Sequence, residues 1–172
     1  MKSCLLRPGL HLLLLFSIIT AFTSCSYNVY VVRHAEKAVS PPADPPLSPV
    51  GMQRSADLKQ TLQGEKIKVI YSTRTARTMQ TAAPLASYLN IQTIPYGPRP
   101  DSSLVAKIKS GKKNTLVVGH SNTVDDVVNL LCGSKVISKD LSESVYDNLY
   151  IVRIKRGGGK PTLVSKKYGR SN

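Results

Sequence analysis

Two histidines follow runs of apolar, strand-forming residues, and arginines follow or flank the same kind of run. His34 ends VYVVRH directly after Arg33, His120 ends LVVGH, and the run VIYS precedes Arg74 and Arg77. A neutral histidine can attack phosphorus, and the guanidinium fork donates paired hydrogen bonds to phosphate oxygens. Polar residues at the carboxyl ends of neighbouring parallel strands converge in one crevice. The pattern therefore predicts a site for a tetrahedral dianion.

Alternating strand and helix patterns are expected to position these side chains. The alternation predicts a three-layer α/β/α fold, with a mostly parallel sheet, helices on both of its faces and an antiparallel C-terminal hairpin at one edge. The expected strands are 29–32, 67–72, 91–96 and 114–120, the expected helices are 49–62, 75–90, 102–110 and 123–132, and the hairpin pairs 148–156 with 160–169.

The first expected helix follows a stiff loop, residues 38–49, that contains five prolines. Ser48 is a suitable N-cap, and Pro49 fits the first helical position because its missing N–H would be unpaired there in any case. We expect Met52, Leu58 and Leu62 among the residues that this helix turns toward the core.

The N-terminus has the features of a bacterial export signal. Lys2 and Arg7 precede an apolar run over 10–22 that is short for a membrane span. The stretch FTSCS resembles a lipobox, which implies that residues 1–24 are removed and that Cys25 is acylated; the alternative is a plain secretory signal in which Cys25 is incidental. Residues 25–172 would then form one domain in the cell envelope, lipid-anchored and facing the periplasm, with Ser26 favouring the outer membrane.

The net charge and the cysteine content indicate which kinds of substrate, partner and cofactor to expect. The formal net charge is +14 and only 6% of residues are aromatic. Because base stacking needs aromatic side chains, we expect no nucleic acid and favour an anionic substrate. Cys132 lies in an apolar helical run and reads as a core residue. The pattern contains no cluster with metal-ligand spacing, so we expect no metal and no cofactor.

Four segments, taken in order, resemble the histidine phosphatase superfamily, whose fold is that of phosphoglycerate mutase. VVRHAEK is similar to its Arg-His-Gly-Glu signature with Ala35 replacing Gly, and LSPVGMQRSADL, YSTRTARTMQTAAPLA and VVGHSNTV resemble the segments that follow. The resemblance implies that His34 is the nucleophile that becomes phosphorylated. It further implies that Arg33, Arg77 and His120 hold the phosphoryl oxygens, and that no metal is needed.

Other residues near these motifs are further candidates with open alternatives. Arg74 is either a substrate contact or a solvated residue, and Asn122 either binds substrate or caps a helix. Glu36, also a candidate for substrate binding, is expected to support the pocket by pairing with an arginine, and Lys37 to add positive potential at the rim. Asp101 is the one acid in residues 91–113; it is the candidate general acid, or the N-cap of the next helix.

The resemblance is to the small, minimal-cap branch of the superfamily, because the long insertion of true mutases is absent. It implies a phosphatase that hydrolyses phosphomonoesters through phospho-His34, with a phosphorylated small molecule or a phosphoprotein as its partner. The alternatives are a phosphohistidine or phosphoprotein phosphatase, and a non-catalytic lipoprotein that only binds phosphate.

Overall fold

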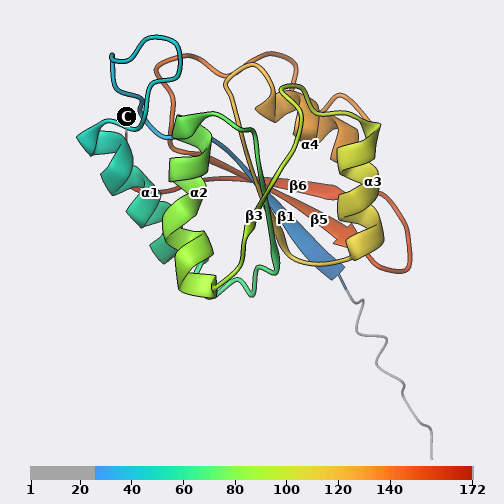
Figure 1. The fold of residues 1–172 in the computed structure, drawn as a ribbon. Coiled ribbons are helices and arrows are strands. Elements are labelled where there is room, and N and C mark those ends of the chain that lie inside the picture. Colours follow the sequence, from blue (N-terminus) through green and yellow to red (C-terminus); the bar gives the residue numbers. More distant parts are fainter. Residues whose placement is uncertain (1–25, 172) are drawn as a thin grey trace, which may run out of the picture.

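The computed structural model describes residues 26–171, so the predicted signal segment 1–24 and Cys25 lie outside the described residues. Within this range the chain forms one sheet and four α-helices (Figure 1). In chain order the elements are β1 (Ser26–Arg33), α1 (Pro49–Leu62), β2 (Val69–Ser72), α2 (Ala76–Leu89), β3 (Thr93–Pro95), α3 (Ser102–Gly111), β4 (Thr115–Gly119), α4 (Val124–Cys132), β5 (Asn148–Lys155) and β6 (Thr162–Lys167).

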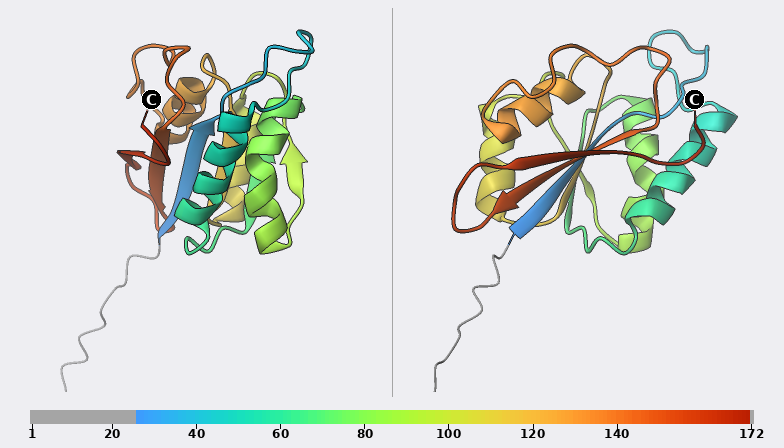
Figure 2. Two further views of the ribbon diagram at one scale, coloured as in Figure 1. Left: turned by 90° about the vertical axis from the view of Figure 1, so that its left-hand side faces the viewer. Right: turned by 180° about the vertical axis from the view of Figure 1, so that it is seen from behind.

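The six strands are ordered β3-β2-β4-β1-β5-β6. The neighbours from β3 to β1 pair in parallel, whereas β5 and β6 are antiparallel additions at one edge. The predicted mostly parallel sheet with a C-terminal edge hairpin is confirmed. In Figure 2 the strand β1 runs from the end where the described chain begins toward the end that carries the long loops. The parallel strands therefore present their carboxyl ends at the loop-bearing end.

Each face of the sheet carries its own hydrophobic core. Successive side chains of a strand point to opposite faces, and in β1 Val31 packs in the cluster formed with α3 and α4, whereas Tyr30 and Val32 pack in the cluster formed with α1 and α2. Figure 1 shows these two helix pairs on opposite sides of the sheet. Because β1 and β4 lie between both layers, their ends are held by packing from two directions.

The start of α1 follows the predicted capping. The Ser48 hydroxyl accepts a hydrogen bond from the Gly51 N–H at 3.1 Å, and the helix begins at Pro49. The buried face contains Leu58 and Leu62 as expected, but the expectation for Met52 is wrong, because its side chain is 56% exposed. The buried positions of α1 are 51, 54, 55, 58 and 62, and Met52 lies about 100° around the helix from position 51.

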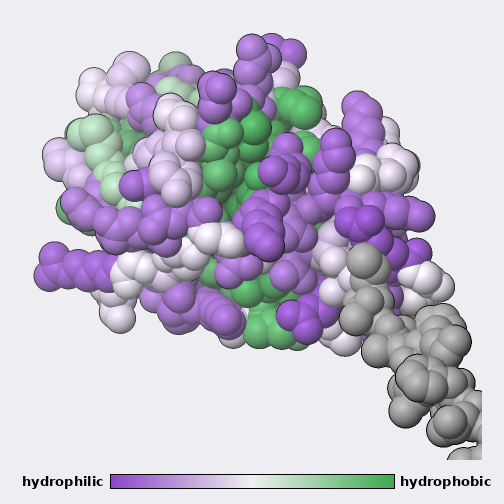
Figure 3. All heavy atoms as spheres, turned by 90° about the horizontal axis from the view of Figure 1, so that it is seen from below, coloured by the Kyte–Doolittle hydropathy of each residue, from purple (hydrophilic) through white to green (hydrophobic). Residues whose placement is uncertain are grey.

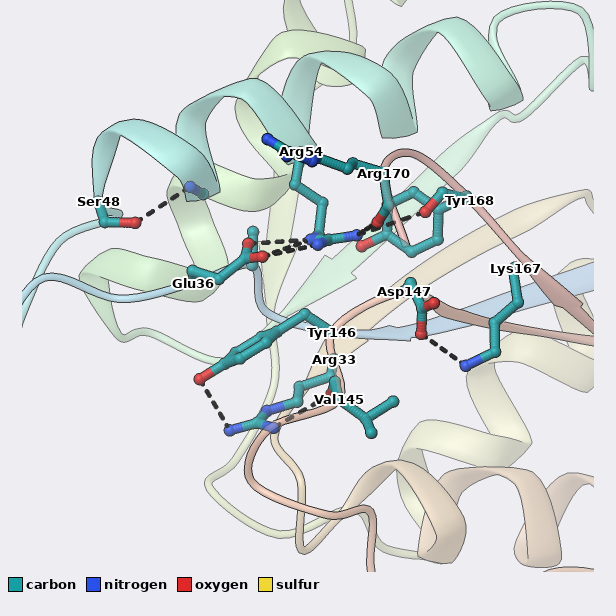
Figure 4. A network of polar contacts seen from close by, with 12 residues as sticks. Arg33, Glu36, Ser48, Arg54, Val145, Tyr146, Asp147, Lys167, Tyr168 and Arg170 are labelled. Carbon is teal, nitrogen blue, oxygen red and sulfur yellow. Dashed lines mark hydrogen bonds and ion pairs between the residues drawn. The ribbon is translucent and has the colours of Figure 1, made fainter. Parts of the chain in front are cut away.

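The close approach of α1 to the loop after β1 fixes where that loop lies. A Cβ atom on Gly51 would stand 2.1 Å from the Glu36 carbonyl oxygen, so only glycine fits there. Arg54, one turn further along α1, donates two hydrogen bonds from Nε and one from Nη2 to the Glu36 carboxylate. Its Nη1 donates to the carbonyl oxygens of Tyr168 and Arg170, which ties the C-terminal segment to the same loop (Figure 4).

Cys132 at the end of α4 is buried in the core, as predicted, and its thiol is free. Burial raises the pKa of this thiol.

Among the described residues, no helix combines the length and the apolar character required to cross a bilayer. All ten elements and both hydrophobic clusters described above lie between Ser26 and Tyr168, within the described residues.

Candidate active site

His34 follows β1 and is held in one orientation. Its ring Nδ1 lies 2.7 Å from the Ala35 carbonyl oxygen. Because a carbonyl oxygen only accepts, Nδ1 carries the proton and Nε2 keeps its lone pair. The backbone around the ring is fixed as well, since the His34 N–H donates to the Gly119 carbonyl at 2.9 Å and the Ala35 N–H donates to the Thr81 hydroxyl at 2.9 Å. The geometry therefore presents Nε2 as the available nucleophilic atom.

His120 follows β4, the parallel neighbour of β1, and its ring centroid lies 5.4 Å from that of His34. An Arg77 Nη2 atom, which only donates, lies 3.5 Å from His120 Nδ1. Nδ1 is then the acceptor, and the proton sits on Nε2, which donates to the Thr73 hydroxyl at 2.9 Å. The Thr73 hydroxyl in turn donates to that of Thr78 at 2.9 Å, and the Thr78 hydroxyl donates to the Thr73 carbonyl. This directional chain holds the tautomer and the plane of the His120 ring.

Both histidines are uncharged at neutral pH. Burial is the main cause that lowers the pKa of His34 to about 3, and the positive charge of Arg33 lowers it further. Burial and the charge of Arg77 lower the pKa of His120 to about 4. A neutral imidazole is the form that attacks phosphorus, so the same arginines that attract an anion also keep the nucleophile deprotonated.

Arg33 is almost fully buried, and its guanidinium is surrounded by the loop that precedes β5. Nη1 donates to the carbonyl oxygens of Ser142, Glu143 and Val145 at 3.0, 2.9 and 3.2 Å. The guanidinium also stacks on the Tyr146 ring, 4.1 Å from its centroid (Figure 4). The remaining Nε–H is buried and has no hydrogen-bond partner among the described residues, and Arg33 lines neither of the two cavities described below.

Glu143 places a carboxylate directly beside the histidines. Its Oε2 lies 2.6 Å from Arg33 Nη2, and its Oε1 accepts a hydrogen bond from the Ser121 hydroxyl. The Ser121 hydrogen bond is the largest cause that lowers the pKa of Glu143, followed by the Arg33 charge. The side chain of Glu143 is 77% exposed. Nothing in its local sequence ties it to the histidine motifs, and sequence reasoning missed it.

Arg77 is paired in a similar way by a loop carboxylate. Asp44, from the proline-rich loop, accepts hydrogen bonds from the Ala76 N–H at the start of α2 and from Arg77 Nη1 at 3.4 Å. Sequence reasoning missed this residue too, because the contact joins positions 33 residues apart through a loop without periodic pattern. Each of the two predicted phosphate-binding arginines thus holds a carboxylate from a flanking loop.

Two adjoining cavities open over this constellation. A cavity of about 880 Å³ is lined by His34, His120 and Arg77 together with Lys37 and Asn122. The neighbouring cavity of about 600 Å³ shares His120 and Arg77 and is lined further by Arg74, Tyr71 and Tyr96. Arg74 therefore lines one of the two cavities, and Asn122 and Lys37 line the other.

Two candidates from the sequence have other partners. Glu36 lines neither cavity, and its carboxylate pairs with Arg54 as described above, which agrees with the expectation that it supports the pocket through an arginine. Asp101 lines both cavities but caps α3, accepting from the Leu104 N–H at 3.0 Å and from the Ser103 hydroxyl at 2.7 Å. These hydrogen bonds lower the pKa of Asp101, so its carboxyl is ionised at neutral pH.

Residues 26–171 contain no group of three or more His, Cys, Asp or Glu side chains arranged to hold a metal ion. The arrangement instead offers a free imidazole nitrogen, a second imidazole and the Arg77 guanidinium around one cavity, with the buried guanidinium of Arg33 in the residue next to His34. Chemically, it can bind a tetrahedral oxyanion and attack it from the His34 side.

Comparisons with known proteins point in the same direction. The sequence profile of the histidine phosphatase superfamily (branch 1) matches residues 29–99, and no curated protein matches the chain significantly. Protein histidine phosphatase SixA, solved in complex with tungstate, is 22% identical, with a TM-score of 0.62 over 81% of this chain and 96% of that chain.

Two further solved structures share the fold at lower identity. A mycobacterial glucosyl-3-phosphoglycerate phosphatase is 10% identical, with a TM-score of 0.65 over 84% of this chain and all of that chain. Phosphoserine phosphatase from Entamoeba histolytica, in complex with 3-phosphoglyceric acid, is 14% identical, with a TM-score of 0.54 over 84% of this chain and 98% of that chain. The profile match covers residues 29–99, fewer than half of the residues of the chain, and the solved structures share its fold.

Proposed function

We propose that this protein is a phosphatase that hydrolyses phosphomonoesters through a phosphohistidine on His34. The observation that carries the proposal is the neutral His34 ring. Its Nδ1–H donates to the Ala35 carbonyl, so that Nε2 keeps a free lone pair for attack on phosphorus. The phosphatase neighbours of the same fold support it.

In the first step, His34 Nε2 attacks phosphorus, a P–N bond forms and the P–O bond to the leaving group breaks. Arg33, Arg77 and His120 hold the three non-bridging oxygens, and the positive charge of the two arginines stabilises the transition state. In the second step, water attacks the phosphohistidine, the P–N bond breaks and inorganic phosphate leaves. His34 returns to its neutral form with Nδ1 still protonated.

The leaving group needs a proton, and the structure favours solvent as the source. Asp101 is ionised and committed to capping α3. Without a positioned acid, which contributes typically 10²–10⁴-fold, turnover depends on how well the leaving group departs unaided. This favours aryl phosphates and, as the second candidate function, protein phosphohistidine, whose P–N bond breaks with an imidazole leaving group.

The test is turnover of 4-nitrophenyl phosphate by residues 26–172, with EDTA present, beside His34→Asn. Asn can still donate to the Ala35 carbonyl but has no nucleophilic nitrogen. Release that persists in EDTA and vanishes in the variant supports the proposal, and quenching with alkaline detergent during turnover would trap an acid-labile, alkali-stable phosphoprotein. A folded protein that binds tungstate or phosphate but releases nothing from either ester or phosphohistidine contradicts it and leaves the non-catalytic binding protein.

We further propose that the mature chain is held in the bacterial cell envelope by a lipid on Cys25. The FTSCS stretch supports this, and β1 starts at the very next residue, Ser26. Mass spectrometry of the protein purified from membranes tests it, because acylation adds a mass that Cys25→Ala abolishes. Unmodified, freely secreted protein contradicts it.

A further inference from the structure

The end of the sheet opposite the histidines is built from four short segments of the chain. They are the start of β1 (26–28), the turn after α1 (64–68), the turn after α3 (109–114) and the turn between β5 and β6 with its flanks (153–160). Hydrogen bonds join them: Asn114 Oδ1 accepts from the Asn28 N–H at 2.9 Å, Asn114 Nδ2 donates to the Glu65 carbonyl at 2.7 Å, and Arg156 Nη2 donates to the Lys112 carbonyl at 3.0 Å. These segments form one continuous surface, which we call the basic face.

The basic face carries a large excess of positive charge. All of its basic side chains are exposed, and none makes an ion pair with a described residue. The single acid of the four segments, Glu65, accepts a hydrogen bond from the Tyr30 hydroxyl at 2.5 Å. The nine basic residues are Lys66, Lys68, Lys109, Lys112, Lys113, Arg153, Lys155, Arg156 and Lys160.

The two ends of the sheet differ in how much of their positive charge is paired, although Lys37, Arg74 and Arg99 at the histidine end also make no ion pair with a described residue. At the histidine end, Arg33 and Arg77 are matched by the carboxylates of Glu143 and Asp44. Figure 3 looks onto the other end, where hydrophilic side chains cover most of the surface and apolar atoms show between them. Unmatched like charges crowded on one face repel one another, and an external polyanion would relieve that repulsion.

The chain enters the fold on this same face. Ser26 pairs with Lys155 across the strands, and Cys25, which is proposed above to carry the lipid, is the residue directly before Ser26. At about 3.3 Å per residue, the seven steps of β1 put the basic face about 23 Å from Arg33. A surface bound to this face would therefore leave the histidines pointing away from it.

We propose that the basic face lies on a membrane surface rich in anionic phospholipid. Clusters of Lys and Arg next to a membrane-associated segment bind such surfaces electrostatically. The lipid proposed above on Cys25, the residue directly before the basic face, favours a membrane over a nucleic acid. The one aromatic residue in the four segments, Tyr27, is buried and offers no platform for base stacking.

Orientation on a membrane has a consequence for substrate access. The Debye length is about 8 Å at physiological salt, well below the 23 Å between the basic face and Arg33. The negative potential of the lipid is screened before it reaches the site. An anionic soluble substrate can therefore approach the histidines while the protein stays bound.

The test is co-sedimentation of residues 26–172 with vesicles of phosphatidylcholine alone or with about one-third phosphatidylglycerol, at low and at physiological salt. Leaving out residues 1–25 removes the predicted lipid and the apolar run, so that only the folded surface is measured. The test variant is Lys113→Glu/Lys160→Glu. The matched control, with the same change in net charge, is Lys139→Glu/Lys166→Glu, because both lysines lie toward the histidine end. Lys139 is two residues from Leu141, whose N–H donates to the Ser121 carbonyl. Lys166 lies opposite Leu149, near the start of β5.

We expect binding to anionic but not neutral vesicles, weakening with salt, with partitioning reduced about tenfold or more in the test variant and little in the control. Turnover of 4-nitrophenyl phosphate should be equal in both variants and unchanged by vesicles. Equal binding to neutral vesicles, or an equal loss in both variants, overturns the proposal. So does a short DNA duplex that removes the protein from vesicles at matched phosphate concentration, because that outcome assigns the face to nucleic acid.

Discussion

The stability of this fold is expected to fall between pH 7.5 and pH 5 because of the two site histidines. In the unfolded chain a histidine has its ordinary pKa of about 6.5, whereas the folded values are about 3 for His34 and about 4 for His120. Between those limits the unfolded state binds protons that the folded state refuses. The stabilisation is therefore complete above pH 6.5 and is lost as the pH falls toward the folded values.

The expected size follows from the same numbers. At pH 5 the unfolded state is favoured by proton binding by about 2 kcal/mol for each of the two histidines. Together they remove about 4 kcal/mol, a large share of the 5–15 kcal/mol that is usual for a folded domain. His34 is only 4% exposed, so solvent screening reduces its contribution to this loss of stability only slightly.

The assay is urea unfolding of residues 26–172 at pH 7.5 and pH 5.0, for the wild type and for His34→Asn. Because Asn does not titrate, the variant should lose about 2 kcal/mol less between the two pH values than the wild type. Carboxylates titrate equally in both proteins and cancel in this double difference. An identical loss in wild type and variant, or a wild-type stability that is flat over this range, would refute the burial of a neutral His34.

Three further predictions concern the surroundings of the site. Glu143→Gln removes the carboxylate that occupies Arg33, so inorganic phosphate should inhibit 4-nitrophenyl phosphate turnover about fivefold more tightly; weaker inhibition would mean that the carboxylate assists binding. Thr73→Val removes the acceptor that orients His120. We expect kcat to fall about tenfold and stability to fall by about 1–3 kcal/mol, because buried hydrogen-bonding groups lose a partner. An unaltered kcat in the folded variant would show that the ring needs no such support. Gly51→Ala forces a methyl carbon to within 2.1 Å of a carbonyl oxygen in the nucleophile loop and should cost about 3 kcal/mol or more in urea unfolding, unless α1 shifts without penalty.

The layered fold was predictable because its signals are local. The continuous apolar run of β1 and the apolar centre of β4 identify strands that are buried on both faces. The Ser48 cap marks where α1 begins. The error at Met52 has the same origin, because a helical pattern fixes which residues share a face only to within about one position. Burial of Arg54 on that face depends on the Glu36 carboxylate, a contact that periodicity does not report.

The site residues that directly follow a strand could be predicted from the sequence, whereas those that lie on loops could not. His34 and His120 end neighbouring parallel strands, so topology alone brings them together. Glu143 and Asp44 reach the arginines from loops whose paths depend on the whole fold. The role of Asp101 could not be decided from the sequence, because its position suits both a general acid and a helix N-cap. The hydrogen bond from the Leu104 N–H in α3 identifies it as the cap.

The buried thiol of Cys132 makes the protein its own reporter of unfolding. It is the single cysteine of residues 26–172, it is 7% exposed, and burial raises its pKa. Thiol reagents attack the exposed thiolate, so the native protein should react slowly at pH 8 and the opened protein quickly. The rate at which a chromogenic disulfide reacts with Cys132 then gives the opening free energy of each variant discussed above, without any added label. Measured beside turnover, it distinguishes a variant that has lost catalytic activity from one that has lost stability.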